Sequence, residues 1–274
     1  MAKVKGTPAP DVIGPVFGPD PAFDGDDTIS AGAQNDTVDT GPGRNWANGN
    51  GGDDWMFGGD NLDTLHGGAQ NDTLVGGGER DLLYGDLDDD LIFGGTENDT
   101  IFGDGLLTAP ERGVGADPSK HADRIFAGRN DDLVFSGPGP DEVHGDQDSD
   151  TLYGGHENDT LDGGTGRDTL VGGPDDDRLT GGDDRDTFVF GSGSGKDVVT
   201  DFDPDRDRII VEPGVNGTGI DDPDALRGRL STNANGDAVL DLGGGNTVTF
   251  TGVGVDELVE RPPGSPDPFV VDYY

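Results

Sequence analysis

The sequence contains no cysteine, which excludes a disulfide framework and a thiolate zinc site. Apolar runs are short as well. Only 30% of the 274 residues are hydrophobic, and no stretch is long enough to span a membrane. Residues 1–12 lack the apolar centre of a conventional signal peptide. We therefore expect neither a transmembrane span nor an N-terminal leader of the usual kind.

Basic residues are scarce. Lys and Arg number 17 against 57 Asp and Glu, which gives a net charge of −40. Nucleic acid is excluded as a partner, because its phosphate backbone would be repelled. Low hydrophobicity with charge of one sign is typical of disordered chains. However, 49 of the acids are Asp, and they accompany 51 Gly. Both favour turns, and carboxylates bind hard cations, so this composition indicates a fold that needs cations.

A nine-residue repeat fills the middle of the chain. It is plain in Gly67–Val75, GGAQNDTLV, and in Gly76–Tyr84, GGGERDLLY. Aspartate occupies the sixth place in 16 of 17 units, and Asn45 occupies it in the remaining one. Aspartate alone could serve to start turns. Its recurrence in one register instead favours a shared role as a ligand.

The eighth place of each unit is apolar. One apolar residue in nine is too few for a helix face, but it fits a short strand with a single inward side chain. The glycine-rich remainder then forms turns. A core this thin cannot offset the conformational entropy of the chain, and stacked turns would bring carboxylates together. We therefore expect an unstable chain in the absence of cations.

These units resemble the GGxGxDxUx nonapeptide of RTX (repeats-in-toxin) haemolysin-type calcium-binding proteins, over about Ala22–Phe190. The resemblance implies an all-β fold: a parallel β-roll, or two-sheet calcium-binding solenoid, with two nonapeptides per coil. It also implies that each Ca²⁺ lies between a turn and the turn 18 residues later, so that Asp63 and Asp81 share a row. Many units have a residue other than the family's Gly at the fourth place, and turns with Gln or Glu there are expected to bind calcium more weakly.

Calcium is the expected cofactor, in several copies. It accepts 6–8 oxygen ligands in flexible geometry, whereas Mg²⁺ demands an octahedron and keeps its waters. Asn45 is neutral and is expected to weaken the calcium sites between its own turn and the neighbouring turns of the row. The predicted metal ligands are Asp27, Asp36, Asp54, Asp63, Asp72, Asp81, Asp90, Asp99, Asp123, Asp132, Asp141, Asp150, Asp159, Asp168, Asp177 and Asp186.

The expected organisation has three parts. Residues 1–21 form a lead-in with a degenerate repeat at Asp11 and Ile13. Residues 22–190 form the roll, with a 15-residue insertion within about 103–121. Residues 191–274 form a small β-rich cap, since the segment from Asp186 to Ile209 resembles the one that closes the rolls of serralysin-type proteases. Strands are expected at 237–242 and 246–250, and short helices at 222–230 and 255–260.

Other candidate sites are weaker. The segment from Asp201 to Glu212 has partial EF-hand spacing, but Arg206 stands where glycine is needed, so a turn between strands is favoured. None of the four histidines lies in a His-Glu-x-x-His motif. The sequence thus predicts no catalytic residue and no enzyme activity.

Aromatic residues gather at the outward ninth place. Tyr84, Phe102, Phe135 and Tyr153 are expected on one sheet, and Phe57, Phe93 and Phe126 on the other. They either pack on one another or under Leu106 and Leu107 of the insertion, or they form a face that binds a glycan or a protein.

The resemblance implies a secreted bacterial protein that leaves the cell through a type I (ABC) exporter, with an uncleaved signal at its C-terminal end. It would fold outside, where calcium is plentiful. The role expected first is a structural or adhesive extracellular module. One alternative is an accessory module of a secreted epimerase or protease, and another is a hydrolase that uses the insertion.

Overall fold

The computed structural model describes residues 3–6, 11–13, 25–104, 122–259 and 267–272. The chain divides into two compact units, residues 1–144 and 145–274, and each is described by itself. Leu106, Leu107 and the rest of segment 105–121 lie outside the described residues, as do the last two tyrosines.

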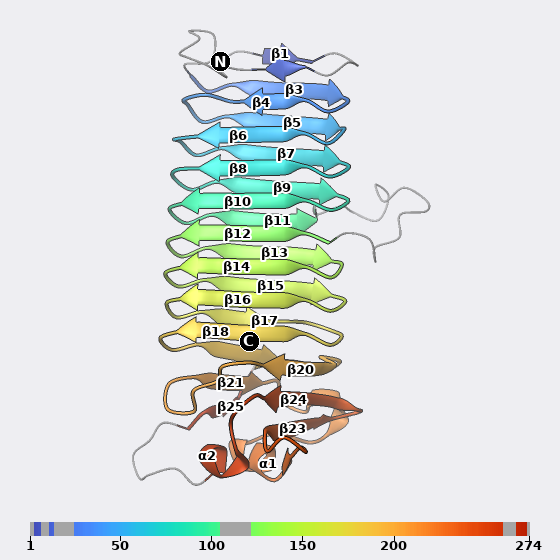
Figure 1. Ribbon diagram of the computed structural model, residues 1–274, viewed down its shortest axis with the longest axis vertical. Coiled ribbons are helices and arrows are strands. Elements are labelled where there is room, and N and C mark those ends of the chain that lie inside the picture. The colour runs from blue at the N-terminus through green and yellow to red at the C-terminus, as the bar shows by residue number, and fades with distance from the viewer. Residues whose placement is uncertain (1–2, 7–10, 14–24, 105–121, 260–266, 273–274) are drawn as a thin grey trace. The chain divides into compact units, whose positions relative to one another are not determined.

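Unit 1 consists of two sheets of short parallel strands (Figure 1). Odd-numbered strands form one sheet and even-numbered strands form the other. The first sheet contains β1 (Lys3–Lys5), β3 (Thr28–Ala33), β5 (Trp46–Gly51), β7 (Thr64–Ala69), β9 (Leu82–Leu87), β11 (Thr100–Asp104) and β13 (Leu133–Pro138). The second contains β2 (Val12–Ile13), β4 (Thr37–Asp39), β6 (Trp55–Gly59), β8 (Thr73–Gly77), β10 (Leu91–Thr96), β12 (Arg124–Arg129) and the first half of β14 (Glu142–Gln147).

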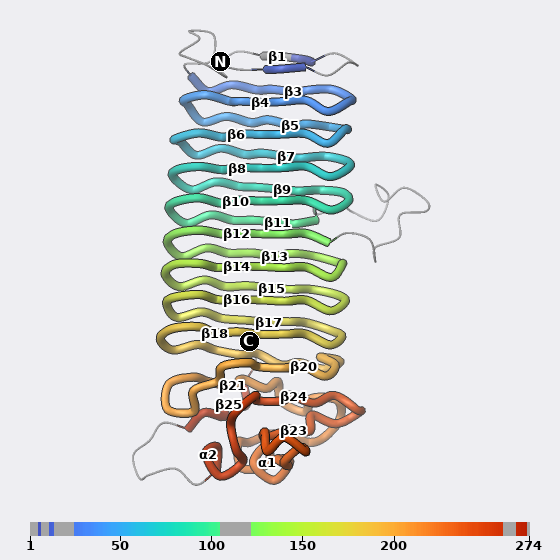
Figure 2. The backbone as a smooth tube through the Cα atoms, viewed as in Figure 1, coloured from blue at the N-terminus to red at the C-terminus, as the bar shows by residue number. Residues whose placement is uncertain are grey.

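Each coil takes two nonapeptides, one for each sheet. Strand β7 pairs in parallel with β9, which places Leu65 beside Leu83, and β6 pairs with β8, which places Met56 beside Leu74. The backbone tube in Figure 2 shows this winding. The predicted fold class, an all-β parallel β-roll, is confirmed.

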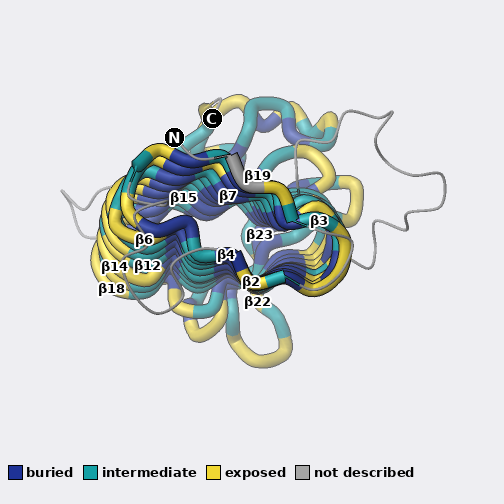
Figure 3. The backbone as a smooth tube through the Cα atoms, turned by 90° about the horizontal axis from the view of Figure 1, so that it is seen from above, coloured by how far each residue is buried: buried dark blue, intermediate teal, exposed yellow. Residues whose placement is uncertain are grey.

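The core is one side chain deep on each strand. The apolar eighth-position residues, from Ile29 to Phe188, are fully buried, and buried residues line the inside of the coils in Figure 3. The next inward position is mostly glycine. A Cβ on Gly67 would lie 2.4 Å from Oδ2 of Asp72 and 2.7 Å from the carbonyl oxygen of Gly85. Oxygen atoms of the turns therefore take up the space that a second row of side chains would fill.

The fourth place of the repeat adopts positive φ even where glycine is absent. Glu79 has φ 68°, and Glu97 and Glu157 both have φ 72°. This conformation costs an L-residue about 1–2 kcal/mol. The structure thus gives the expected weakness of these turns a physical cause.

Unit 2 begins with the same kind of winding and then changes to a different arrangement of strands. Its parallel strands are β15 (Thr151–His156), β17 (Thr169–Val171), β19 (Thr187–Phe190), β21 (Arg208–Val211) and β25 (Phe269–Val271) in one sheet, and β16 (Thr160–Thr165), β18 (Arg178–Asp183) and β20 (Lys196–Val199) in the other. The second sheet then adds β24 (Asn246–Phe250), β23 (Ala238–Gly243) and β22 (Leu230–Thr232), of which the last two pairings are antiparallel.

Two short helices, α1 (Pro223–Arg227) and α2 (Val255–Val259), lie where helices were expected. Asp222 caps α1 by accepting the N–H of Ala225 at 2.8 Å. No helix in the described ranges is long and apolar enough to cross a membrane.

Aromatic rings on the outer faces of unit 1 stack on one another. The ring of Tyr84 lies between those of His66 and Phe102, with centroids 4.4 and 4.9 Å apart and planes within 6° of parallel. Phe102 stacks on Phe135 in turn, at 5.3 Å. Because these rings cover one another's faces, the structure supports the interpretation that they pack among themselves.

Candidate metal-binding turns

The sixth-position aspartates form two rows along the turns. Asp63 illustrates the arrangement: its Oδ1 accepts the N–H of Asn45 at 2.7 Å, and its own N–H donates to Oδ1 of Asp81 at 2.8 Å. Every such step within the uninterrupted repeats spans 18 residues, as the family resemblance implies for Asp63 and Asp81. Oδ1 therefore fixes each carboxylate to the turn before it.

The predicted ligands are distributed over the rows as follows. In unit 1, one row runs through Asp27, Asn45, Asp63, Asp81, Asp99 and Asp132, and the other through Asp11, Asp36, Asp54, Asp72, Asp90, Asp123 and Asp141. In unit 2, one row holds Asp150, Asp168, Asp186 and Asp207, and the other holds Asp159, Asp177 and Asp197.

The second carboxylate oxygen, Oδ2, is buried in many of these aspartates. Among the described residues no hydrogen-bond donor reaches Oδ2 in ten of the predicted ligands, which are Asp36, Asp54, Asp63, Asp72, Asp81, Asp90, Asp99, Asp123, Asp177 and Asp186. These oxygens also face other oxygens. A Cβ placed on Gly58 would lie 2.5 Å from the carbonyl oxygen of Gly76 and 2.9 Å from Oδ2 of Asp63. Buried acceptors that face one another require a proton or a cation between them.

Burial shifts the acidity of these groups strongly. It raises the pKa of Asp63 and Asp72 to about 8, and the pKa of Asp54 to about 6. For Asp90, burial and then the charge of Asp123 raise the pKa to about 10. The metal-free fold therefore holds carboxyl groups that resist ionisation at neutral pH. A bound cation removes this penalty.

The available ligands suit a hard cation. Within the described ranges no group of three or more His, Cys, Asp or Glu side chains comes together. An ion held by these turns would thus take its remaining ligands from backbone carbonyls. Carboxylate and carbonyl oxygens in flexible numbers match Ca²⁺, whereas Mg²⁺ prefers a rigid octahedron that keeps several waters. The residues present fit calcium.

The rows extend beyond the residues that the repeat identified. Asp197 accepts the N–H of Asp177, and Asp207 accepts the N–H of Asp186, both at 3.1 Å. Asp197 is 2% exposed, its Oδ2 has no donor among the described residues, and burial raises its pKa to about 8. These steps span 20 and 21 residues, so a search with period nine misses them.

The degenerate first unit also joins a row. The N–H of Asp11 donates to Oδ1 of Asp36, and Ile13 is 7% exposed beside Val38 on strand β4. The predicted lead-in repeat is therefore built like the others at these two positions.

The segment with partial EF-hand spacing forms a turn between β20 and β21. Oδ1 and Oδ2 of Asp201 accept the N–H groups of Gly181 and Gly182 at 2.9 and 2.8 Å. Asp203 accepts the N–H of Asp205. Asp201 thus bonds the backbone of β18 and Asp203 bonds the turn itself, which supports the interpretation favoured from the sequence.

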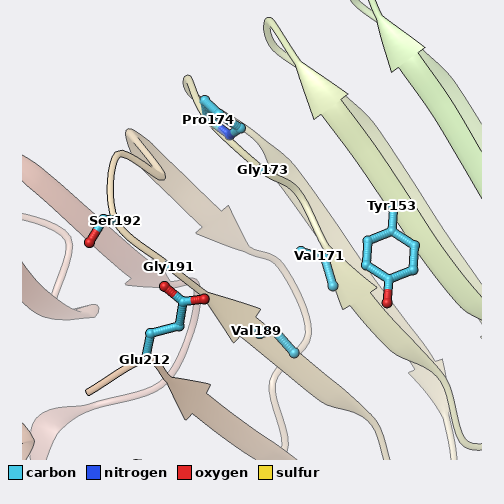
Figure 4. A pocket seen from close by; sticks show the side chains of 8 residues that line it. All are labelled: Tyr153, Val171, Gly173, Pro174, Val189, Gly191, Ser192 and Glu212. Carbon is cyan, nitrogen blue, oxygen red and sulfur yellow. The ribbon is translucent and has the colours of Figure 1, made fainter. Parts of the chain in front are cut away.

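A cavity of about 570 Å³ lies on the outer face of unit 2 (Figure 4). Val171 and Val189 lie between Tyr153 on one side and Ser192 with Glu212 on the other. The Ser192 hydroxyl already accepts the N–H of Asn216 at 3.0 Å. The described lining offers this serine no histidine that could activate it as a nucleophile.

Comparison with known proteins identifies one family and several similar solved structures. The family model of the RTX calcium-binding nonapeptide repeat matches residues 22–47, 39–74, 48–83, 75–105, 122–143, 135–170 and 162–196. No curated protein matches the chain. Among solved structures, extracellular lipase LipA from Serratia marcescens is similar at 19% identity and a TM-score of 0.27, over 84% of this chain and 40% of the lipase.

Proposed function

Since this chain belongs to the RTX calcium-binding nonapeptide repeat family, we propose that its aspartate rows bind several Ca²⁺ ions and that binding drives its folding. One observation carries the proposal: ten of the predicted ligands bury an Oδ2 atom that lies near other oxygens and that no donor reaches among the described residues. The proposed ligands are the 16 predicted aspartates together with Asp197.

The aspartate Oδ1 atoms and the first-place glycines have different roles in the proposed sites. Oδ1 of each aspartate holds its carboxylate in place by accepting an N–H of the preceding turn, as Asp72 does for Asp54 at 2.7 Å. Glycine in the first place leaves room for oxygen atoms alone, as at Gly67. The ion, when bound, supplies the positive charge that permits ionised carboxylates inside the turns.

We propose that the protein is secreted and acts as a structural or adhesive module outside the cell. A chain with net charge −40 and a core one residue deep is unstable where calcium is scarce. Such a chain could pass a type I exporter unfolded and fold where calcium is plentiful. Calcium-dependent binding to cell surfaces or glycans would support the adhesive role, while co-purification with an epimerase or protease would support an accessory role.

A calcium titration followed by circular dichroism tests the proposal. We expect cooperative formation of β-structure with Ca²⁺, reversal by a chelator, and little change with Mg²⁺ at the same concentration. A chain that keeps the same spectrum and melting temperature in chelator as in Ca²⁺ would contradict it.

A further inference from the structure

One turn of unit 1 is built differently from its neighbours. Asn45 occupies the sixth place in it, and its Oδ1 accepts the N–H of Asp27 at 2.8 Å, as an aspartate Oδ1 would. This bond fixes the orientation of the amide, because the atom that faces an N–H must be an acceptor. The NH₂ group therefore occupies the place of the missing Oδ2.

This NH₂ group bonds the oxygens of its own turn. Nδ2 of Asn45 lies 3.1 Å from Oγ1 of Thr40 and 3.2 Å from the carbonyl oxygens of both Gly41 and Gly43. The hydroxyl of Thr40 then donates to the carbonyl oxygen of Gly58, in the next turn of the row, at 2.6 Å. In the aspartate turns, the equivalent oxygens lie near a carboxylate Oδ2 that has no hydrogen-bond donor. In this turn they lie near N–H and O–H donors instead.

The backbone of this turn matches that of an aspartate turn. Gly41 and Gly43 have φ 72° and 121°, and the equivalent Asn50 and Gly52 of the Asp54 turn have φ 77° and 118°. The difference therefore lies in the side chains, and it involves two of them. Among the described turns Thr40 is the one threonine at the first place, where most turns have glycine, and it is fully buried.

We infer that the position between the turn Thr40–Asn45 and the next turn of its row, which ends at Asp63, takes no cation, because the Asn45 amide and the Thr40 hydroxyl replace it with hydrogen bonds. This inference rests on the proposed calcium binding of the aspartate turns. It goes further than the expectation that Asn45 merely weakens the calcium sites beside it. The calcium row is interrupted at this turn, and the turn closes without an ion.

Exchanging the two side chains tests the inference. The double variant Thr40→Gly with Asn45→Asp restores the pattern of an aspartate turn, and we expect it to bind one more Ca²⁺ per chain than the wild type. The reciprocal variant, Gly67→Thr with Asp72→Asn, transplants the pair into an aspartate turn and should bind one fewer. Native mass spectrometry at saturating Ca²⁺ counts the ions, and circular dichroism checks that each variant folds.

The outcomes separate the inference from the proposed function. An unchanged ion count in the folded restored variant would overturn the inference, as would an unchanged count in the folded transplanted variant. If one variant fails to fold, the other still decides. A wild-type chain that binds no Ca²⁺ at all would instead refute the proposed function.

Discussion

The N–H of Asp90 donates to Oδ1 of Asp123 at 2.8 Å across a sequence separation of 33 residues. The row thus keeps its register through the insertion. A Cβ on Gly103 would lie 2.3 Å from Oδ2 of Asp123, which is the relation found within an ordinary turn between Gly67 and Asp72. The turn is therefore assembled from residues on both sides of the insertion.

Deleting residues 106–120 should preserve the fold. The deletion joins Gly105 to His121 and leaves GDGHAD, a turn of normal length that ends at Asp123. We expect stability within about 1 kcal/mol of the wild type in Ca²⁺, because closing a longer loop costs little. Urea unfolding measures this. A loss of several kcal/mol in the deletion variant would contradict the assembly described above.

Replacing Asp63 by Ala should cost about 2–4 kcal/mol of unfolding free energy in Ca²⁺, since it removes a proposed ligand and leaves the buried N–H of Asn45 without its acceptor. The midpoint of the calcium titration should also rise. Asp60→Ala removes the same charge from an exposed position of the same turn and serves as the matched control. Equal effects of the two substitutions would show that charge alone matters.

Acid should favour the metal-free fold. Burial raises the pKa of Asp63 from 3.8 to about 8, so the folded state binds protons more tightly than the unfolded state. This contribution to stability is complete below about pH 4 and is lost as the pH rises through about 8. In chelator, β-structure measured by circular dichroism should therefore increase from pH 8 to pH 4. In Ca²⁺ the trend should reverse, because protons compete with the ions, and a pH-independent calcium midpoint would contradict this account.

Replacing Glu79 by Gly should stabilise the calcium-loaded protein by about 1 kcal/mol, because Glu79 has φ 68° and glycine adopts that conformation without strain. Burial is the main cause of the raised pKa of Asp81, and the charge of Glu79 raises it further. Glu79→Ala removes the charge but keeps Cβ, so the difference between the two variants in urea unfolding isolates the backbone effect. If Ala stabilises as much as Gly, the strain is negligible.

The repeat was sufficient to predict the roll. Its sixth-place residues form the aspartate rows and its eighth-place residues form the core, because each coil repeats the previous one in register. The cap was harder, since Asp197 and Asp207 follow their row neighbours by 20 and 21 residues and no periodicity marks them. The hydrogen bonds of Asn45 also escaped prediction. They depend on Thr40 five residues earlier, and only the folded turn shows that the two side chains meet.

The in-register pairing of each strand with its second successor has a consequence for the length of the roll. Leu65 lies beside Leu83, and both are enclosed by the same kinds of neighbours. Duplicating any 18 consecutive residues of a regular stretch would create no new type of contact. Copy number can therefore change by whole coils through simple tandem duplication, which leaves evolution and the protein engineer free to adjust the span of the roll without redesigning its interior.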